Sequence, residues 1–169
     1  SSLWYLADKY QWQLTEKTIG VVGVGNIGRR LVTALQALNI TVLQCDPLRA
    51  QQEADFAHTD FSALCQQADI ISFHTPLIKD GLYQTKHLLD SACLTHLKPT
   101  CAIINASRGA VIDNTALLAA QQIQRRPLVL DVWDNEPNVL QELVPYTRIA
   151  TAHIAGHSIE GKARGTEML

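Results

Sequence analysis

The sequence predicts an α/β fold in which helices cover both faces of a doubly wound parallel sheet. Short apolar runs alternate with longer segments of helical periodicity, beginning with residues 19–22, 26–38 and 41–45. A strand, a helix and a second strand in this order form a parallel βαβ unit. The strands are apolar throughout, which is typical of a sheet buried on both faces. The length of 169 residues favours a single domain.

The remaining elements continue this alternation. Helices are expected over residues 61–67, 89–97 and 114–124, and strands over 70–73, 101–105, 128–132 and 148–151. Asp60 and Asp113 precede two of these helices and are predicted to cap them. Apolar residues at helical spacing from Leu3 to Leu14 indicate an amphipathic helix packed on the domain. The sheet should therefore contain six or seven short strands.

Composition excludes several classes of protein. The net charge is −2 and the basic residues are scattered, which argues against a nucleic-acid partner. Apolar runs are too short to span a bilayer and the N-terminus lacks a signal pattern, so we expect a cytoplasmic protein without a membrane partner. The four cysteines form no CxxC pair and lie in apolar stretches, typical of reduced core residues. No histidine has metal-ligand spacing, so no metal site is predicted.

A glycine motif follows the first predicted strand. Residues 23–28 read Gly-Val-Gly-Asn-Ile-Gly and open the first long helix. In this position Gly23 permits a tight turn, Gly25 lets a ligand approach the backbone, and Gly28 allows the helix to pack closely on the strand. The motif alone arises by chance in roughly one chain in twenty of this length, so its position between strand and helix carries the inference. It predicts a dinucleotide pyrophosphate at the helix N-terminus.

The end of the second strand indicates which dinucleotide binds. Asp46 lies 18 residues after Gly28, where a carboxylate can accept hydrogen bonds from the adenosine ribose hydroxyls and would repel a 2′-phosphate. The alternative for Asp46 is a turn residue before Pro47, and the nearby Arg49 leaves NADP open. We favour NAD and a Rossmann-like sheet.

Three polar residues follow later strands. Arg108, Glu136 and His153 lie in the segments Asn-Ala-Ser-Arg-Gly, Trp-Asp-Asn-Glu-Pro and Ala-His-Ile-Ala-Gly. The carboxyl ends of the strands in a doubly wound sheet share one crevice, so these side chains can meet there.

These segments resemble the signatures of the D-2-hydroxyacid dehydrogenases, and the resemblance covers nearly the whole chain. It implies oxidation of a 2-hydroxy acid by a catalytic set of Arg108, Glu136 and His153. Removing a hydride and a proton from such an acid requires a base near the hydroxyl, for which His153 is the candidate, while Glu136 would orient its imidazole and Arg108 would hold the substrate carboxylate. The resemblance also implies contact of Asp131 with the nicotinamide carboxamide. Thr75 and Gly156 are carried over in the same way. The resulting cofactor-binding set is Gly23, Gly25, Asn26, Ile27, Gly28, Asp46, Thr75, Pro76, Ser107, Asp131 and Gly156. His58, His74, His87 and His96 are interpreted as surface, packing or locally hydrogen-bonded residues.

Within that family, residues 73–77, 79–85, 153–156 and 160–166 are similar to members that oxidise 4-phospho-D-erythronate on the route to pyridoxal phosphate. The expected partner is thus a small 2-hydroxy acid phosphate, contacted by Arg108 and by His157, which stands where we expect a tyrosine. The alternatives are a phosphoglycerate or glyoxylate/hydroxypyruvate type of dehydrogenase and a non-catalytic NAD(H)-sensing binding protein. The resemblance also implies a homodimer.

Three parts are expected along the chain. Residues 1–16 would form a linker helix packed on the domain, residues 17–156 the NAD-binding domain, and residues 157–169 the start of a return helix. The substrate domain of the family is expected to be absent from this chain. We therefore expect these residues alone to bind the cofactor without useful turnover, since the catalytic cleft of such enzymes closes between two domains.

Overall fold

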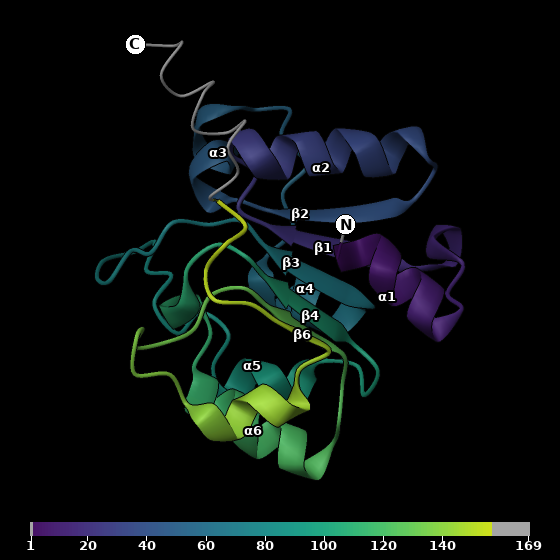
Figure 1. Cartoon of the computed structure of the whole chain (residues 1–169). Helices are drawn as coiled ribbons and strands as arrows, with labels where there is room; N and C mark the ends of the chain where they lie inside the picture. The colour runs from purple at the N-terminus through teal and green to yellow at the C-terminus, as the bar shows by residue number, and fades with distance from the viewer. Residues whose placement is uncertain (1, 157–169) are drawn as a thin grey trace, which may run out of the picture.

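The computed structural model describes residues 2–156, and its centre is one six-stranded parallel sheet (Figure 1). The strands are β1 (Thr18–Val22), β2 (Thr41–Cys45), β3 (Ile70–Phe73), β4 (Ala102–Asn105), β5 (Leu128–Leu130) and β6 (Ile149–Ala150). Their order in the sheet is β2-β1-β3-β4-β5-β6. The chain runs outward from β1 to β2 and then returns to the other side of β1, so a topological switch point lies between β1 and β3. The predicted doubly wound fold is confirmed.

Helices cover both faces of this sheet. They are α1 (Ser2–Tyr10), α2 (Asn26–Ala37), α3 (Pro47–Gln52), α4 (Phe61–Gln67), α5 (Ser91–His96) and α6 (Asn114–Ile123), with 3-10 turns η1 (Leu14–Glu16), η2 (Gly109–Val111) and η3 (Gln141–Tyr146). Figure 1 shows α2 above the sheet and α5 and α6 below it. None of the helices within residues 2–156 combines the length and the apolar character needed to cross a bilayer.

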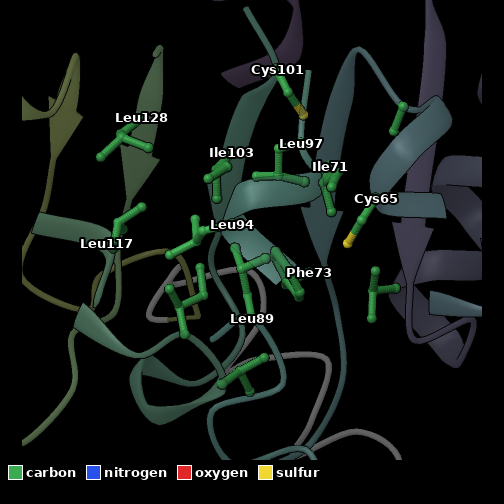
Figure 2. Packing of buried hydrophobic residues seen from close by; sticks show 14 of the residues in the cluster. Cys65, Ile71, Phe73, Leu89, Leu94, Leu97, Cys101, Ile103, Leu117 and Leu128 are labelled. Atoms are coloured by element: carbon green, nitrogen blue, oxygen red, sulfur yellow. The ribbon is translucent and has the colours of Figure 1, made fainter. Parts of the chain in front are cut away.

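Alternate residues along the strands pack into two separate hydrophobic cores, one on each face of the sheet. Ile19 and Val21 of β1 pack with α1 and α2 on one face. Ile71 and Phe73 of β3 pack with α4, α5 and α6 on the other, where Figure 2 shows Phe73 near Leu89 and Leu94. The period of two along a strand explains this division. The inner strands β1, β3, β4 and β5 are therefore buried on both sides, as their apolar sequences predict, whereas the edge strands β2 and β6 are partly exposed.

Several predicted boundaries need correction. The expected helix over 89–97 begins only at Ser91, because the Asp90 carboxylate accepts a hydrogen bond from Cys93 N at 2.8 Å and caps it. Asp113 caps α6 through Ala116 N at 3.0 Å, as predicted. The prediction for Asp60 is wrong: within residues 2–156 its side chain accepts no capping bond, and it lies 3.6 Å from His58 Nε2. The strands expected over 128–132 and 148–151 are shorter than predicted.

The short helix α3 and the segment after it were not predicted. Asp46 starts α3 by accepting a hydrogen bond from Arg49 N at 3.1 Å, and Pro47 occupies the first turn. His58 then forms a single parallel bridge with Gln44 of β2. This bridge takes the place of an outer strand beside β2, so residues 2–156 contain six strands, within the expected six or seven.

The cysteines are core residues. Cys45, Cys65 and Cys101 are buried, Cys93 is half-buried, and all four are free thiols. Burial raises the pKa of Cys45, Cys65 and Cys101 to about 12 in each case. These thiols are therefore protonated at neutral pH and behave as small apolar residues.

Candidate functional site

A cavity of about 440 Å³ opens at the switch point, above the carboxyl ends of β1, β2 and β3. Five of the predicted cofactor-binding residues line it: Gly23, Gly25, Asp46, Thr75 and Pro76. The other side is formed by residues 78–85, and Thr85 Oγ1 ties that segment to Pro76 O at 2.6 Å. The structure thus brings the first part of the predicted site together.

Two glycines of the motif are required by the protein itself. Gly23 has a φ of +84°, and a Cβ there would lie 2.7 Å from the backbone of His74 and Thr75 at the end of β3. A Cβ on Gly28 would lie 2.1 Å from Gly23 O. The roles predicted for these residues, a tight turn and close helix–strand packing, agree with these distances.

Gly25 differs from both, because a Cβ at this position would meet no described atom within 4 Å. The protein therefore does not need glycine here for its own packing, whereas a ligand entering the cavity would meet that Cβ. Gly25 also precedes α2, and Asn26 and Ile27 form the first turn of that helix. The first backbone N–H groups of a helix have no hydrogen-bond acceptor within the helix, so they can donate to the oxygens of a pyrophosphate. These residues fit a dinucleotide.

Asp46 joins the glycine loop to the end of β2. Its Oδ2 accepts a hydrogen bond from Val24 N at 2.9 Å, while Oδ1 caps α3. A carboxylate oxygen can accept more than one hydrogen bond, so Asp46 can do this and still face a ribose. Asp46 can therefore act as a turn residue before Pro47 and also bind a ribose.

Arg49, the residue that left NADP open, is engaged within the protein. Its Nη1 donates to Val24 O at 3.0 Å and its Nε donates to Glu53 Oε1 at 2.8 Å. The guanidinium also pairs with the second Glu53 oxygen and lies 4.4 Å from the centroid of the Phe56 ring. The guanidinium of Arg49 is thus already bound by groups of the protein itself.

Two histidines border the cavity. His58 was interpreted as a surface or packing residue, but it lines the cavity and its Nδ1 accepts a hydrogen bond from Asp46 N at 3.3 Å. No local motif marks His58, because its position depends on the unpredicted bridge to β2. His74 lies 2.9 Å from Ser72 Oγ through Nε2, and burial lowers its pKa. The interpretation of His74 as a locally hydrogen-bonded residue agrees with this geometry.

The loop after β4 carries Ser107 and Arg108. Asn105 Oδ1 accepts hydrogen bonds from Ser107 N and Oγ at 3.0 and 2.8 Å, and its Nδ2 donates to Arg108 O at 3.1 Å. Arg108 Nη1 donates to Ser107 O at 2.7 Å. A Cβ on Gly109 would lie 1.8 Å from Trp133 O, so the backbone after β4 packs directly on the backbone after β5. That contact brings the segments that contain Arg108 and Glu136 together.

Glu136 and His153 form a hydrogen-bonded pair. Glu136 Oε2 lies 2.8 Å from His153 Nδ1, and Glu136 Oε1 accepts a hydrogen bond from Trp133 N at 2.7 Å. About a third of the Glu136 side chain and two fifths of the His153 side chain are exposed. The carboxylate is thus fixed by the backbone and in turn orients the imidazole, as predicted.

Asp131 holds the segment that presents His153. Its carboxylate accepts hydrogen bonds from Thr151 Oγ1, Ile154 N and Ala155 N at 2.6 to 2.9 Å. Its carbonyl accepts one from His153 N at 2.7 Å, and His153 has a φ of +55°. Burial alone would raise the pKa of Asp131, but these hydrogen bonds and the charge of His153 hold it below its ordinary value. Contact with a carboxamide stays a prediction.

A second cavity of about 270 Å³ lies beside these residues, between α1 and the carboxyl ends of β4, β5 and β6. Asn105, Ala106, Asp131, Thr151 and Ile154 contribute to its walls. Gly156 is exposed and follows Ala155, the last residue that lines this cavity. His157 and the return helix expected over 157–169 lie outside the described residues. Histidine, cysteine and carboxylate side chains of residues 2–156 form no group of three suited to a metal ion.

Known proteins resemble this chain in sequence and in fold. The chain is 52% identical over 170 aligned residues to "Erythronate-4-phosphate dehydrogenase" of Pseudoalteromonas translucida, covering all of this chain and 46% of that protein. A D-lactate dehydrogenase with NAD+ from Lactobacillus jensenii superposes with a TM-score of 0.74 at 27% identity, over 93% of this chain and 51% of the other. A glyoxylate reductase from Paecilomyes thermophila gives 0.75 at 25% identity, over 98% and 53%.

The chain therefore spans about half the length of the proteins it matches. A family profile described as "D-isomer specific 2-hydroxyacid dehydrogenase, NAD binding domain" matches residues 2–155. This match extends over nearly the whole chain and includes the glycine loop and the Glu136–His153 pair. The chain belongs to the NAD-binding domains of the D-isomer-specific 2-hydroxyacid dehydrogenases, with NAD as its cofactor.

Proposed function

We propose that the protein containing this chain oxidises 4-phospho-D-erythronate to the corresponding 2-oxo acid with NAD+, on the route to pyridoxal phosphate. The observation that carries the proposal is the 2.8 Å contact between Glu136 Oε2 and His153 Nδ1, held by the backbone at the carboxyl edge of the sheet. The choice of substrate rests on 52% identity to a relative named for it.

The chemistry divides among three side chains. His153 accepts the proton of the substrate hydroxyl through Nε2, the ring nitrogen on the far side from Glu136. Glu136 fixes the imidazole and stabilises its charged form. Arg108 binds the substrate carboxylate through its planar fork and positions the carbon that loses hydride. The cofactor, when bound, accepts that hydride. Both electrons and the proton removed from the alcohol are thereby accounted for.

Cofactor contacts follow from the same arrangement. Gly23, Gly25, Asn26, Ile27 and Gly28 would hold the pyrophosphate and Asp46 the adenosine ribose. At the other end, we assign the nicotinamide to the cavity beside Asn105 and Asp131. Thr75, Pro76, Ser107 and Gly156 complete the proposed set, and His157 is proposed to contact the substrate phosphate.

A substrate panel tests the proposal in the full-length protein. NADH formation is followed with 4-phosphoerythronate, 3-phosphoglycerate, glycerate and D-lactate, and the reverse reaction with glyoxylate and hydroxypyruvate. We expect the highest kcat/KM for 4-phosphoerythronate. A higher value for another acid would assign the protein to that type of dehydrogenase. Tight NADH binding without oxidation of any hydroxy acid would instead identify an NAD(H)-sensing protein and overturn the enzymatic proposal.

Two subsidiary expectations belong to the same proposal. These 169 residues alone should bind NADH without useful turnover, because the substrate domain of the family would close over the cofactor. The full-length protein should form a homodimer, the commonest closed assembly of identical subunits. Turnover by the isolated chain, and sedimentation of the full-length protein as a monomer, would contradict the first and second expectations respectively.

A further inference from the structure

A third cavity lies at the opposite edge of the sheet from the cofactor site. It measures about 250 Å³ and is bordered by the segments that precede β4, β5 and β6, together with the end of α1. Three arginines, Arg125, Arg126 and Arg148, contribute to its walls. No aspartate or glutamate lines it in the part of the chain that the structure describes. Positive charge therefore gathers at this cavity without a local counter-charge.

Arg126 is the unusual member of this group. It is 8% exposed, and its Nε and Nη1 atoms are buried without a hydrogen-bond partner among residues 2–156. Gln121 bonds only the backbone of Arg126, through its N and O atoms at 2.8 and 2.9 Å. Burial lowers the pKa of the guanidinium, yet an arginine stays protonated near neutral pH. A buried cation without a partner is costly, and most buried charges in proteins are paired.

The neighbouring side chains shape the cavity. Arg148 Nε donates a hydrogen bond to the Tyr10 hydroxyl at 2.6 Å, and Arg125 lies 4.7 Å from the centroid of the Tyr146 ring. Tyr10 stacks on Trp12 with ring centroids 5.0 Å apart. These contacts hold two exposed arginines around the buried one. A further cavity along α5 and α6 also borders Arg126 and likewise has no acidic residue in its described lining.

We propose that this cavity is a binding site for a small anion that carries a phosphate or carboxylate group, with Arg126 as its buried contact and Arg125 and Arg148 at its mouth. Guanidinium groups bind both kinds of anion through paired, charge-assisted hydrogen bonds. Water could satisfy the N–H groups of the two buried nitrogen atoms, but it would not neutralise three positive charges. The site is separate from the cofactor cavity and does not depend on the proposed substrate.

Inorganic phosphate is the probe. It is titrated into the full-length protein at constant ionic strength with NADH at saturation, so that the glycine loop is already filled. Calorimetry measures the affinity, and the ¹⁵N–¹H signal of Arg126 Nε reports where phosphate binds. We expect saturable binding that shifts this signal. Citrate and acetate in place of phosphate distinguish a site for phosphate from one for carboxylate.

Variants separate this site from general charge effects. Arg126→Gln should weaken phosphate binding at least about tenfold and should raise Tm in phosphate-free buffer, since it removes an unpaired buried charge. Arg148→Gln, at an exposed position, tests the same cavity if Arg126→Gln does not fold. Arg30→Gln on the exposed face of α2 removes the same charge elsewhere and should bind as wild type.

Three results would overturn the proposal. The first is equal phosphate affinity in wild type, Arg126→Gln and Arg148→Gln. The second is an Arg126 Nε signal that does not move while phosphate binds elsewhere. The third is an absence of binding in the full-length wild-type protein, which would mean that a carboxylate from another part of that protein, or water, satisfies Arg126. None of these results bears on the dehydrogenase proposal, which is tested by NADH formation.

Discussion

The two ends of the carboxyl edge of the sheet are built by different means. At β1–β3, the site is mainly backbone: Gly23 has a φ of +84°, and Gly28 would clash with Gly23 O if it carried a Cβ. At β4–β6, the site consists of side chains on loops, and the Glu136–His153 pair is partly exposed. The first end is therefore determined by close packing of backbone on backbone, and the second by hydrogen bonds that loop side chains make.

This difference indicates how binding and chemistry are divided. The geometry of the glycine loop is fixed by close backbone contact with the end of β3 and by the hydrogen bond from Val24 N to Asp46, and we propose that this loop holds the dinucleotide. His153 depends on Asp131, which ties residues 151–155 to the end of β5, and on Glu136, which is fixed by Trp133 N. Changes at the first end should mainly alter cofactor affinity, and changes at the second should mainly alter turnover.

The largest expected effect is on turnover. In the full-length protein, His153→Gln should lower kcat by roughly 10²- to 10⁴-fold, because the proposed general base is lost. The NADH dissociation constant should stay close to that of wild type, since His153 lies at the β4–β6 end. Steady-state kinetics and a fluorescence titration with NADH measure the two quantities.

His96→Gln is the matched control. His96 lies on α5, where its Nδ1 contacts Ala92 O at 2.8 Å, away from both ends of the site. This variant should keep wild-type kinetics. If His153→Gln retained kcat within a few-fold of wild type, or lost NADH affinity as strongly as turnover, the proposed division between the two ends would be wrong.

The next comparison is between two glycines of one loop. Gly28→Ala places a Cβ 2.1 Å from Gly23 O and should lower the free energy of unfolding by about 1–3 kcal/mol, because backbone must move. Gly25→Ala meets no described atom within 4 Å and should leave that free energy nearly unchanged. It should nevertheless weaken NADH binding roughly tenfold, equivalent to about 1.4 kcal/mol. Urea unfolding and calorimetry provide the measurements.

The opposite ranking would contradict this account of the loop. If Gly25→Ala unfolded more readily than Gly28→Ala, the space seen at Gly25 would not reflect the protein in solution. If Gly25→Ala bound NADH as wild type does, the cofactor would not approach the backbone at that residue.

Asp131 gives an effect of similar size that depends on pH. Asp131→Asn should lower the free energy of unfolding by about 1.5–3 kcal/mol at pH 7, because a charged acceptor of two backbone N–H groups is lost. The native pKa of Asp131 is lowered, so its stabilising contribution is fully present above the unfolded-state pKa of about 4. The contribution is lost as the pH falls through the native pKa.

The difference in stability between wild type and Asp131→Asn should therefore shrink below about pH 4. Urea unfolding from pH 7 to pH 3 measures it. Asp8→Asn, on the exposed face of α1, is the control and should show little difference at any pH. A difference that stayed constant or grew on acidification would reverse the sign expected for Asp131.

Local signals in the sequence were sufficient for most of the fold. The apolar runs located β1 to β4 within one residue at either end, because a strand buried on both faces has no polar positions to obscure it. The helix α3 was not predicted, because Asp46 already had an interpretation as the end of a strand. The strands predicted over 128–132 and 148–151 were too long, because the chain leaves the strand conformation at Asp131 after β5 and at Thr151 after β6, where hydrogen bonds to the Asp131 carboxylate hold the loop.

The site was predictable to a different extent at each end. The glycine motif at residues 23–28 and Asp46 lie at the ends of two consecutive strands. The geometry of this part of the site could therefore be inferred from their spacing in the sequence. The role of Asp131 in holding residues 151–155, and the place of His58 in the cavity, depend on contacts across strands. One sequence contains no local signal for such contacts, just as nothing local indicates that Arg126 Nε and Nη1 are buried without a partner among the described residues.

The smallest expected effect concerns the choice of cofactor at the adenosine end. Glu53→Gln removes the negative charge paired with Arg49 and leaves its guanidinium with neutral partners, among them Val24 O and the Phe56 ring. Arg49 should become available to a 2′-phosphate, and the preference for NADH over NADPH should fall by roughly fivefold at most, as expected for an exposed ion pair. Asp46 still repels that phosphate, so NADH should remain the better ligand.

Calorimetry with both cofactors measures this preference, and a second change identifies its source. Adding Arg49→Ala to Glu53→Gln should abolish the gain in NADPH affinity, because the guanidinium that would bind the 2′-phosphate is then absent. A gain that persisted in the double variant would mean that the removed glutamate charge acts on NADPH directly. An unchanged preference in Glu53→Gln would show that Asp46 alone sets the choice, with Arg49 retained by its backbone and aromatic contacts.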